Sequence, residues 1–580
     1  MKERFKKLLE EKKFHYLCIF LISLLVAIPL INLKVCHTHD GNLHILRLMG
    51  TKLSMHYTAF PHLVIPFFCS NFGYSINAFY APLTTYASYF IAQLPILCAE
   101  ALKLFAYLTI LLSGITMYHC AYEITKRRKV ALVAGLVYML APYRGEDIYT
   151  RFAMAEFATF VFIPIIFQGL HNLLEGDKTK HWYLTIGGAA LVLTHTITTL
   201  YVGIFCLVYV ISYWKKKNQE EILKKLIWNI FFVLGITAFF WVVLLEFRMF
   251  TKYIFFDQEL MRTKLEYVEN ETIEWEDFVK RDTNEDKTKL SYRLGTFTIL
   301  LFAVSIVAIK QQRKEKFYVI FVGLALLSLL LCTKNFPWKE MPKLLGQIQY
   351  PWRMLGEFVF FSSIVIAKNC EWIWQTLQGK KIGKVGFLMI CIILLTNQVY
   401  NGLERYAAAQ RNELEDDRAY EDFISQHLNF SIFYINRDYL PYKAILHRDE
   451  FETKEDSVSV LEGQARITEN EKDGTNLACK LKDVKKGTKL EIPYFYYPGY
   501  VVTLKSGEEE KILKQEESEY GMITVTLPED METAEITVKY QGTTLEKASY
   551  ILSFVSYLLF LAYIIRERRK EKNEEKSHEK

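Results

Sequence analysis

The sequence predicts a polytopic α-helical membrane protein with about twelve transmembrane helices and a C-terminal extracytoplasmic β-rich domain. Three observations predict this fold class. Many apolar runs of membrane-spanning length occupy the first 400 of the 580 residues. Short clusters of Lys and Arg separate these runs. Residues 401–547 are instead polar and charged, with the apolar-polar alternation of strands.

The average composition hides this division, because 51% hydrophobic and 23% charged residues are close to the values of soluble proteins. We therefore expect three parts. Residues 1–400 form a transmembrane domain, residues 401–547 form an extracytoplasmic helical linker and a β-sandwich-like domain, and residues 548–580 form a final transmembrane helix with a basic cytoplasmic tail.

The first span is expected at residues 15–33, after a basic N-terminal segment. At 1.5 Å per residue this run extends about 28 Å, close to the thickness of the hydrocarbon core. The segment resembles a signal peptide but has no small-x-small cleavage site, so we interpret it as an uncleaved helix with the N-terminus inside.

The remaining spans follow from apolar length and from the positive-inside rule. Residues 84–99 would reverse the charge pattern if they crossed, so we expect a re-entrant or surface helix there. The basic loops then all lie inside, and outer loops are expected at 34–99, 143–155, 247–293 and 333–353. Runs 130–142 and 182–194 are shorter than the ~20 residues that a span normally needs. The eleven further spans are expected near 103–124, 130–142, 156–173, 182–194, 196–213, 224–246, 294–310, 317–332, 354–372, 385–400 and 548–565.

The polar region from about residue 450 onward contains the strand-like segments LEIPYFYY, YVVTLKSGEEEKIL, MITVTLP and AEITVKY. Residues 404–427 before it are expected to be helical. Neither piece contains a Ser/His/Asp triad, a zinc pattern or a phosphate-binding loop. The net charge of +6 arises largely from the inner loops, so nucleic acid is not an expected partner, and no disulfide framework is predicted.

The richest polar cluster is the first outer loop, at residues 36–47. If a helix begins near Asp40, then Asp40, His44 and Arg47 share one face. This set suits a general base acting on an acceptor hydroxyl, with an arginine holding a phosphate. The alternative interpretation is that Asp40 only caps the helix. His37, His39, Asp40 and His44 could also bind a metal, but their spacing matches no specific motif.

Three more clusters are predicted on the same membrane face. Arg151 and Glu156 could meet near the bilayer surface, as a functional pair or as an ordinary interfacial ion pair. Arg353 enters a span after an aromatic segment, where it could neutralise a lipid phosphate or belong to an aromatic belt. His195 lies in an outer turn, where a satisfied buried histidine is the alternative.

Several strings together resemble bacterial YfhO-like membrane proteins, a family also described as related to 6-pyruvoyl-tetrahydropterin synthase. They cover nearly the whole chain, and their order makes the resemblance more specific than any one of them. No zinc motif supports pterin chemistry here. The strings are H-D-x-x-x-H-x-x-R at 39–47, the pair Gly73 and Tyr74, FYAPL at 79–83 with Tyr80, R-x-A-x-x-E at 151–156, THTITTLY at 194–201, QYPWR at 349–353, DYLPY at 438–442 and YYPGY at 496–500.

The family looks like a branch of the GT-C class of membrane glycosyltransferases. The resemblance implies a polyprenyl-phosphate-linked sugar donor and an acceptor on the outer face, a cell-envelope glycan, polymer or lipid. An acidic residue in the first outer loop of GT-C enzymes serves as base or positions the acceptor, which maps onto Asp40. A second acid would be Glu156, Asp147 or Glu146, in that order.

The leading hypothesis is therefore an envelope glycosyltransferase of the cell membrane, with both termini cytoplasmic. The expected catalytic residues are Asp40, Glu156 and Asp147. A metal could assist, but the sequence requires no cofactor. The alternatives are a lipid or glycan transporter or flippase, and a non-catalytic envelope assembly protein. The expected substrate-binding residues are His39, His44, Arg47, Tyr80, Arg151, His195 and Arg353.

Overall fold

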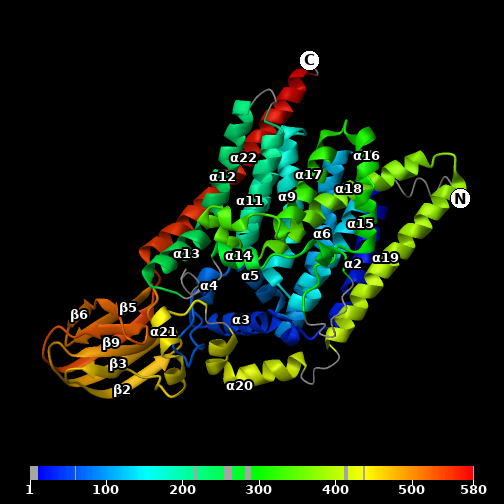
Figure 1. The fold of residues 1–580 in the computed structure, drawn as a ribbon. Helices are drawn as coiled ribbons and strands as arrows, with labels where there is room; N and C mark the ends of the chain where they lie inside the picture. The colour runs from blue at the N-terminus through cyan, green and yellow to red at the C-terminus, as the bar shows by residue number, and fades with distance from the viewer. Residues whose placement is uncertain are drawn as a thin grey trace.

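The computed structural model describes residues 11–58, 60–214, 219–253, 264–280, 289–410, 416–435 and 438–578. Helices form a bundle, and a β-sheet region lies at one end of it, opposite the end where the chain terminates (Figure 1).

Five helices within the described ranges are long and apolar enough to cross a membrane. A sixth candidate consists of α12 (Gln219–Ile236) and α13 (Ala238–Phe250), which are bent by 66° at their junction. The chain is therefore a helical membrane protein, as the sequence predicted. The five are α2 with the turn η1 (together Lys12–Ile31), α6 (Cys98–Thr125), α9 (Met154–Leu174), the first part of α19 (Lys381–Leu403) and the first part of α22 (Thr544–Arg569).

Helices also stand at the other predicted spans, but they are shorter, broken or more polar. Two of them, α7 and α10, have only 12 and 10 residues. Twelve crossings thus stay a prediction, because length and composition support five or six. These other helices are α7 (Arg128–Met139), α10 (Tyr183–Val192), α11 (Thr196–Ser212), α15 (Thr296–Ala303) with α16 (Ser305–Gln312), α17 (Lys316–Cys332) and α18 (Leu355–Thr376).

Short helices line the end of the bundle that carries the β-sheets. One of them, α5 (Pro82–Ile91), occupies the segment predicted as a re-entrant or surface helix, and its 10 residues are too few to span. Further short elements are α3 (Gly41–Ser54), α4 (Ile76–Phe79), α8 (Pro142–Gly145), the π-helical turn η3 (Glu146–Arg151), α14 (Leu265–Asn270) and α21 (Tyr442–Leu446). The longer helix α20 (Asp417–Ile435) has 19 residues. Short 3-10 turns are η2 (Val35–His37), η4 (Lys178–Lys180), η6 (Trp275–Phe278), η7 (Trp338–Glu340), η8 (Lys343–Ile348), η9 (Pro351–Met354) and η10 (Arg448–Glu452).

Helix α20 lies across this end of the bundle and holds the starts of two other segments (Figure 1). Its Glu421 accepts hydrogen bonds from the N–H groups of Cys98 and Ala99, at 3.0 and 2.7 Å, and so caps α6 from a distant part of the chain. Its Asp417 accepts from the N–H of Cys36 at 3.0 Å and pairs with Lys103 at 2.7 Å. The linker is therefore fixed to the first outer loop.

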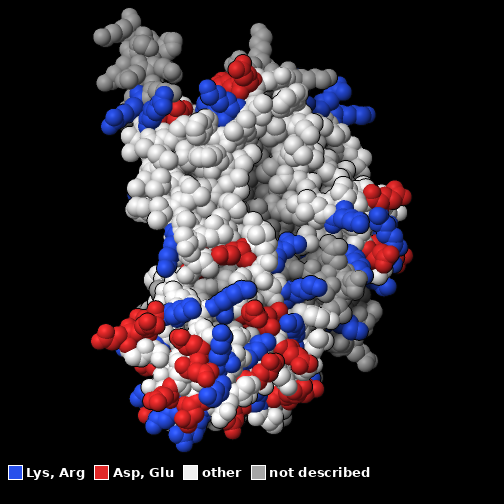
Figure 2. All heavy atoms as spheres, turned by 90° about the vertical axis from the view of Figure 1, so that its left-hand side faces the viewer, with Lys and Arg blue, Asp and Glu red and all other residues white. Residues whose placement is uncertain are grey.

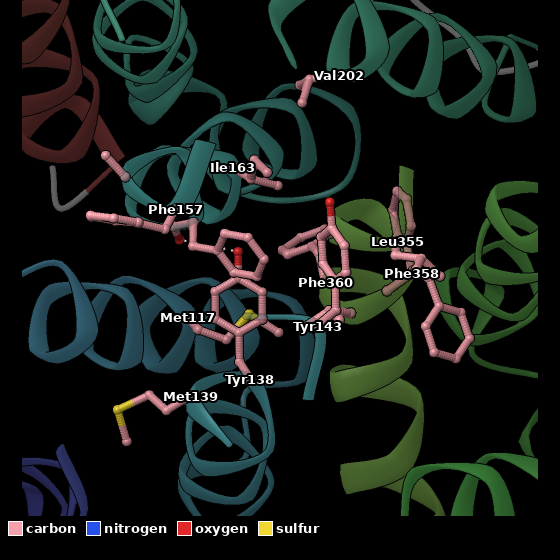
Figure 3. Packing of buried hydrophobic residues seen from close by; sticks show 14 of the residues in the cluster. Met117, Tyr138, Met139, Tyr143, Phe157, Ile163, Val202, Leu355, Phe358 and Phe360 are labelled. Atoms are coloured by element: carbon pink, nitrogen blue, oxygen red, sulfur yellow. Dashed lines mark hydrogen bonds between the residues drawn. The ribbon is translucent and has the colours of Figure 1, made fainter. Parts of the chain in front are cut away.

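The bundle core is built by α6, α7, α9 and α18 (Figure 3). Helices α6 and α7 approach closely where Gly135 faces Gly114, because glycine has no side chain to separate the two backbones. A Cβ on Gly135 would stand 3.0 Å from the carbonyl oxygen of Gly114. The rings of Phe167 on α9 and Phe360 on α18 stack with centroids 4.8 Å apart. Close helix packing and stacked aromatic rings together stabilise the core of this domain.

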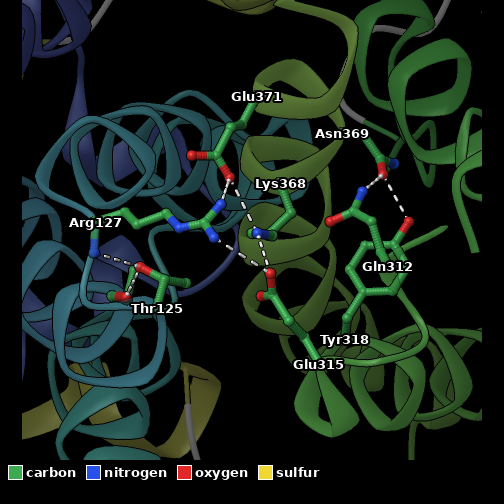
Figure 4. A network of polar contacts seen from close by, with 9 residues as sticks. Thr125, Arg127, Gln312, Glu315, Tyr318, Lys368, Asn369 and Glu371 are labelled. Carbon is green, nitrogen blue, oxygen red and sulfur yellow. Dashed lines mark hydrogen bonds and ion pairs between the residues drawn. The ribbon is translucent and has the colours of Figure 1, made fainter. Parts of the chain in front are cut away.

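A polar network joins the ends of α7, α17 and α18 that the charge rule assigns to the inner side (Figure 4). Lys368 is 2% exposed and pairs with Glu315 at 2.9 Å and Glu371 at 3.0 Å. Arg127 contacts the same two carboxylates. The buried ammonium is thus neutralised by two acids, as a buried charge requires.

In the described part of the chain, nine strands form two antiparallel sheets, with orders β1-β4-β8-β7 and β2-β3-β9-β5-β6. Residues from both sheets belong to one buried cluster, so the sheets share a core, consistent with the sandwich-like arrangement expected from alternation. The register pairs Cys479 with Ile536 and Ile492 with Ile523. The strands are β1 (Ser459–Glu462), β2 (Arg466–Asp473), β3 (Asn476–Val484), β4 (Lys489–Phe495), β5 (Tyr500–Ser506), β6 (Glu509–Ile512), β7 (Gln515–Glu517), β8 (Met522–Thr526) and β9 (Met531–Tyr540).

Part of the predicted first outer loop packs into this β-sheet core, a contact that the sequence did not predict. Phe68, Phe72 and Ile76 belong to the same buried cluster as the strands. The N–H of Phe495 donates to the carbonyl of Phe72 at 3.0 Å. Lys472 pairs with Asp456 and donates to the carbonyl of Asn71 at 2.7 Å. The loop and the strands therefore form one folding unit.

The surface charge follows this architecture. Figure 2 shows a broad band almost free of charged side chains, between a basic rim at the top and the densely charged β-sheet region at the bottom. Exposed apolar side chains of the helices include Phe231 on α12 at 52% and Phe554 on α22 at 64%. Such a belt of exposed apolar residues suits contact with lipid hydrocarbon.

Candidate functional site

A cavity of about 1010 Å³ lies between the helical bundle and the short segments next to the β-sheets. Its walls come from the start of α3, the start of α11, the turn η9 and the loop before α21. These segments are far apart in the sequence, so the fold brings together all four predicted polar clusters. Six of the predicted site residues line the cavity: His39, Asp40, Tyr80, Arg151, His195 and Arg353.

Asp40 is held at the cavity by the backbone of the second polar cluster. Its N–H donates to the carbonyl of Arg151 at 2.8 Å, and the N–H of His39 donates to the carbonyl of Thr150 at 3.3 Å. The segment before α3 is thus paired with the π-helical turn η3. This pairing places the Asp40 carboxylate close enough to Arg151 to favour the charged form of its guanidinium.

The structure does not support the interpretation of Asp40 as a helix cap. Asp40 occupies the N-cap position of α3, but its side chain makes no capping hydrogen bond. Thr38 takes that role instead, because its Oγ1 accepts from the N–H of Gly41 at 3.1 Å. A Cβ at Gly41 would stand 2.0 Å from the carbonyl oxygen of Val35, so this tight start requires glycine. The carboxylate of Asp40 is therefore not used by the helix.

His44 and Arg47 lie behind the cavity wall and are not part of its lining. Arg47 is 2% exposed, donates from Nε to Asn77 at 2.9 Å, and stacks its guanidinium 4.6 Å from the ring centre of Tyr80. His44 stands edge-on to the same ring. Burial lowers the pKa of His44 to about 4, so its imidazole is neutral. Both residues support Tyr80, which does line the cavity.

Glu156 organises the two arginines of the cavity wall. Its carboxylate accepts from Arg151 at 2.8 Å and from the hydroxyl of Tyr143 at 2.5 Å, and it pairs with Arg353 at 3.1 Å. The expected contact between Arg151 and Glu156 is therefore present. Because all of these partners surround it and it does not line the cavity, the carboxylate is placed to position the arginines.

Asp147 is also buried behind the wall, with none of its surface exposed. It accepts a second hydrogen bond from Arg151, at 2.5 Å. Glu146 is likewise buried and accepts from the N–H of Ser291 at 3.4 Å. Of the acids predicted for catalysis, Asp40 alone is among the residues that line the cavity in the described part of the chain.

Aromatic rings frame the two arginines. Arg151 lies 4.8 Å from the ring centre of Trp352, and Arg353 lies 4.7 Å from that of Tyr350. Tyr350 and Trp352 both line the cavity. The aromatic segment at residues 349–353 is thus a platform for guanidinium groups in this structure, in addition to any role at the membrane interface.

His195 caps α11 with its ring. Nδ1 accepts from the N–H of Thr198 at 3.3 Å, so the ring proton is on Nε2 in the neutral form. Burial and the nearby Arg353 lower the pKa of His195 to about 3. His195 is therefore a neutral side chain that lines the cavity. It also has a structural role, as the alternative interpretation expected, because its ring caps α11.

Several cavity residues were not predicted as site residues. The loop before α21 contributes Asp438 and Tyr439, and Tyr439 is fixed by stacking on Phe79 with centroids 4.7 Å apart. The hydroxyl of Tyr497, in the YYPGY string, donates to the carbonyl of Tyr439 at 3.1 Å. The DYLPY and YYPGY strings were signals for this contact, but neither string by itself indicated which cavity it serves. Other polar residues of the lining include Arg248, Glu271, Tyr292, Gln349 and Arg448.

A positive φ occurs directly after Arg151 and four residues before Arg353. Phe152 has φ 52° and Gln349 has φ 59°. Non-glycine residues rarely adopt this region, and it concentrates at functional sites. Here the two turns direct Arg151 and Arg353 toward the same carboxylate, Glu156.

The described residues contain no group of three or more His, Cys, Asp or Glu side chains arranged to hold a metal ion. The alternative in which His37, His39, Asp40 and His44 share a metal is therefore not supported by their placement, because His44 lies behind the wall.

Comparisons with known proteins assign the family. Residues 77–397 match the family described as 6-pyruvoyl-tetrahydropterin synthase related domain, membrane protein. The chain belongs to this family of membrane proteins, as its YfhO-like strings indicated. A protein of Lactococcus lactis subsp. cremoris, described as uncharacterized, is 23% identical over 97% of this chain and 96% of its own length.

Two solved structures are similar in arrangement. The archaeal oligosaccharyltransferase AglB from Archaeoglobus fulgidus, in complex with an inhibitory peptide and a dolichol-phosphate, has a TM-score of 0.44 at 13% identity and is matched over 69% of this chain and 56% of its own. The apo oligosaccharyltransferase of Archaeoglobus fulgidus has a TM-score of 0.41 at 11% identity, over 71% and 60%. The chain thus spans little more than half of each of these proteins.

Proposed function

We propose that this protein is a membrane glycosyltransferase that transfers a sugar from a polyprenyl-phosphate carrier to a cell-envelope acceptor on the extracytoplasmic face. One observation carries the proposal. The carboxylate of Asp40, which no helix end uses, faces a cavity whose walls hold Arg151 and Arg353 in fixed positions. The resemblance to GT-C enzymes, which led to the expectation for Asp40, supports the same assignment.

In the proposed reaction, a base and an anion-binding group act on two sides of the donor sugar. Asp40 accepts the proton of the acceptor hydroxyl as that oxygen attacks the anomeric carbon of the donor sugar. The bond from this carbon to the phosphate oxygen breaks, and the electron pair leaves with the lipid phosphate. The products are the glycosylated acceptor, the polyprenyl phosphate and a protonated Asp40.

The arginines stabilise the leaving phosphate. Guanidinium groups bind phosphate oxygens with two parallel hydrogen bonds, and they are most effective when they are preorganised. Glu156 and Asp147 supply that preorganisation, because both carboxylates bind Nη1 of Arg151. We therefore assign Glu156 and Asp147 as positioning residues. His195 is assigned as a neutral hydrogen-bond donor to the headgroup of the lipid-linked sugar.

The remaining walls suit carbohydrate. Tyr80, Tyr292, Tyr350 and Tyr439 line the cavity. Aromatic rings pack against the apolar faces of sugars while their polar ends find hydrogen-bond partners. Because Asp438 and Tyr439 come from the segment before the β-sheets, the extracytoplasmic domain contributes to acceptor binding and not to the central chemistry.

The decisive variant is Asp40→Asn, expressed in cells that lack the native gene. We expect normal membrane abundance but at least ~100-fold slower transfer, because the base is lost. Mass spectrometry should show accumulation of one polyprenyl-linked sugar and loss of that sugar from an envelope polymer or lipid. Asp530→Asn is the matched control, since Asp530 is 62% exposed and does not line the cavity.

Two outcomes would contradict the proposal. Full transfer by Asp40→Asn would remove Asp40 as the base. Unchanged envelope chemistry in the deletion strain, together with an altered distribution of a lipid between the leaflets, would indicate a flippase.

A further inference from the structure

A second cavity of about 440 Å³ lies between α2, the segment around η3 and α19. Its long walls are apolar, including Leu25 and Val26 of α2 and Val399 and Leu403 of α19. Figure 1 shows α19 at the edge of the bundle, and its spanning window has no buried residue. The cavity is therefore bordered by a helix whose surface is available to lipid.

One end of this cavity is cationic. Arg144 and Arg293 line it together with Glu146, so the charged groups among its described lining residues sum to one positive. Arg293 forms no ion pair with any residue in the described ranges. Arg144 is 1% exposed, donates to the carbonyl of Thr109 at 2.9 Å and contacts Ser113, yet its Nε has no hydrogen-bond partner among the described residues. The Oε1 of Gln398, also in the lining, has none either.

A narrow partition separates this cavity from the candidate active site. In the extended segment before α15, Leu290 and Tyr292 line the active-site cavity, whereas Ser291 and Arg293 line the second one. The turn η3 divides in the same way, because Arg151 lines the first cavity and Glu146 the second. The two cavities are thus distinct but share a wall.

We propose that the second cavity binds an anionic phospholipid of the bilayer, with an acyl chain between α2 and α19 and the phosphodiester against Arg293 and Arg144. Apolar length next to a cationic end matches the two chemical parts of such a lipid. A phosphodiester carries one negative charge, equal to the excess positive charge of the site. The free Nε–H of Arg144 supplies a buried donor that would otherwise stay unsatisfied.

The test uses the full-length protein in mixed micelles with equal amounts of phosphatidylglycerol and phosphatidylcholine, followed by native mass spectrometry. We expect one retained phosphatidylglycerol, preferred at least tenfold over phosphatidylcholine, and a higher melting temperature with the anionic lipid. Arg293→Gln should lower the preference about tenfold, as expected for loss of one charge-assisted hydrogen bond, whereas Arg293→Lys should keep most of it.

A filling variant tests the apolar part. Val399→Trp should abolish lipid retention, whereas Ile390→Trp on the same helix should not, because Ile390 is 57% exposed and lies outside the cavity. Melting temperatures within a few degrees of the wild type would show that both variants fold. Equal retention of the two phospholipids, unchanged retention by Val399→Trp, or preferential retention of added undecaprenyl phosphate would overturn the assignment. The site stands independently of the proposed transferase activity, since no arm of this test measures transfer.

Discussion

At the scale of single residues, the candidate site separates groups that face the cavity from groups that hold them. Asp40, Arg151 and Arg353 face it, while Glu156 and Asp147 stand behind the arginines. This division could not be read from the sequence, where four of the five are polar residues of predicted outer loops and Glu156 is the first residue of a predicted span. Their roles depend on which side of a turn each side chain leaves the backbone.

Glu156→Gln should affect stability more than Asp40→Asn. The amide keeps the shape of Glu156 but leaves Arg151 and Arg353 without their shared carboxylate in a buried place. Removing one partner of a buried ion pair costs about 3–5 kcal/mol, so we expect a clearly lower melting temperature in detergent. Asp40→Asn should melt near the wild type, because its carboxylate makes no capping bond. Equal melting temperatures for the two variants would argue against the positioning role.

The buried His44 should make the folded protein less stable at acidic pH. Its pKa is lowered to about 4 by burial, below the ordinary value of 6.5, so between these values the unfolded chain binds more protons than the folded one. The stabilisation is complete above about pH 6.5 and falls as the pH drops toward 4, by about 3 kcal/mol at most. Melting temperatures of His44→Gln should depend less on pH in this window. The exposed His427→Gln is the control and should retain the pH dependence of the wild type.

At the scale of elements, the sequence predicts where helices and strands lie along the chain better than it predicts which elements pack together. Apolar runs located α2, α6, α9, α19 and α22, and alternation located β4, β5, β8 and β9. The short helices around the cavity, such as α3 and α11, depend on local signals: Thr38 before Gly41, and His195 before Thr198. The insertion of residues 63–79 into the β-sheet core has no local signal, because its apolar residues also resemble a membrane segment.

We expect Lys472 to stabilise the packing of the predicted first outer loop against the β-sheets. It donates to the carbonyls of Asn71 and Pro493, pairs with Asp456, and lies 4.4 Å from the ring centre of Tyr494. Lys472→Met would leave Asp456 and two carbonyls without their donor, at a cost of about 3 kcal/mol.

Limited proteolysis of the full-length protein measures how firmly the predicted first outer loop is packed against the β-sheets. We expect faster cleavage within residues 60–75 in Lys472→Met. Lys480→Met is the matched control on the neighbouring strand, because Lys480 pairs with Glu469 at the exposed surface. If both variants were cleaved at the wild-type rate, the loop would not depend on Lys472.

At the scale of the whole molecule, the two ends of the helical bundle differ, and the charge rule predicts which membrane face each end occupies. The candidate site, the short helices and the β-sheets lie at one end of the bundle, and the network of Lys368 and Arg127 joins helix ends that the rule assigns to the other side (Figures 1 and 4). A site for a lipid-linked sugar needs this arrangement, because the headgroup must meet its acceptor at one membrane face while the lipid stays in the bilayer.

The topology itself is therefore the last prediction. Single cysteines are introduced into a background in which all ten native cysteines are replaced, and intact cells are treated with a membrane-impermeant maleimide. Positions 510 and 343 are exposed and should react, because they lie in the β-sheet region and in a predicted outer loop. Positions 128 and 314, equally exposed but in predicted inner loops, should react only after the membrane is permeabilised. Reaction of position 128 in intact cells would place the basic loops outside. It would then also place the cavity that contains Asp40 on the cytoplasmic face, where an envelope acceptor could not reach it.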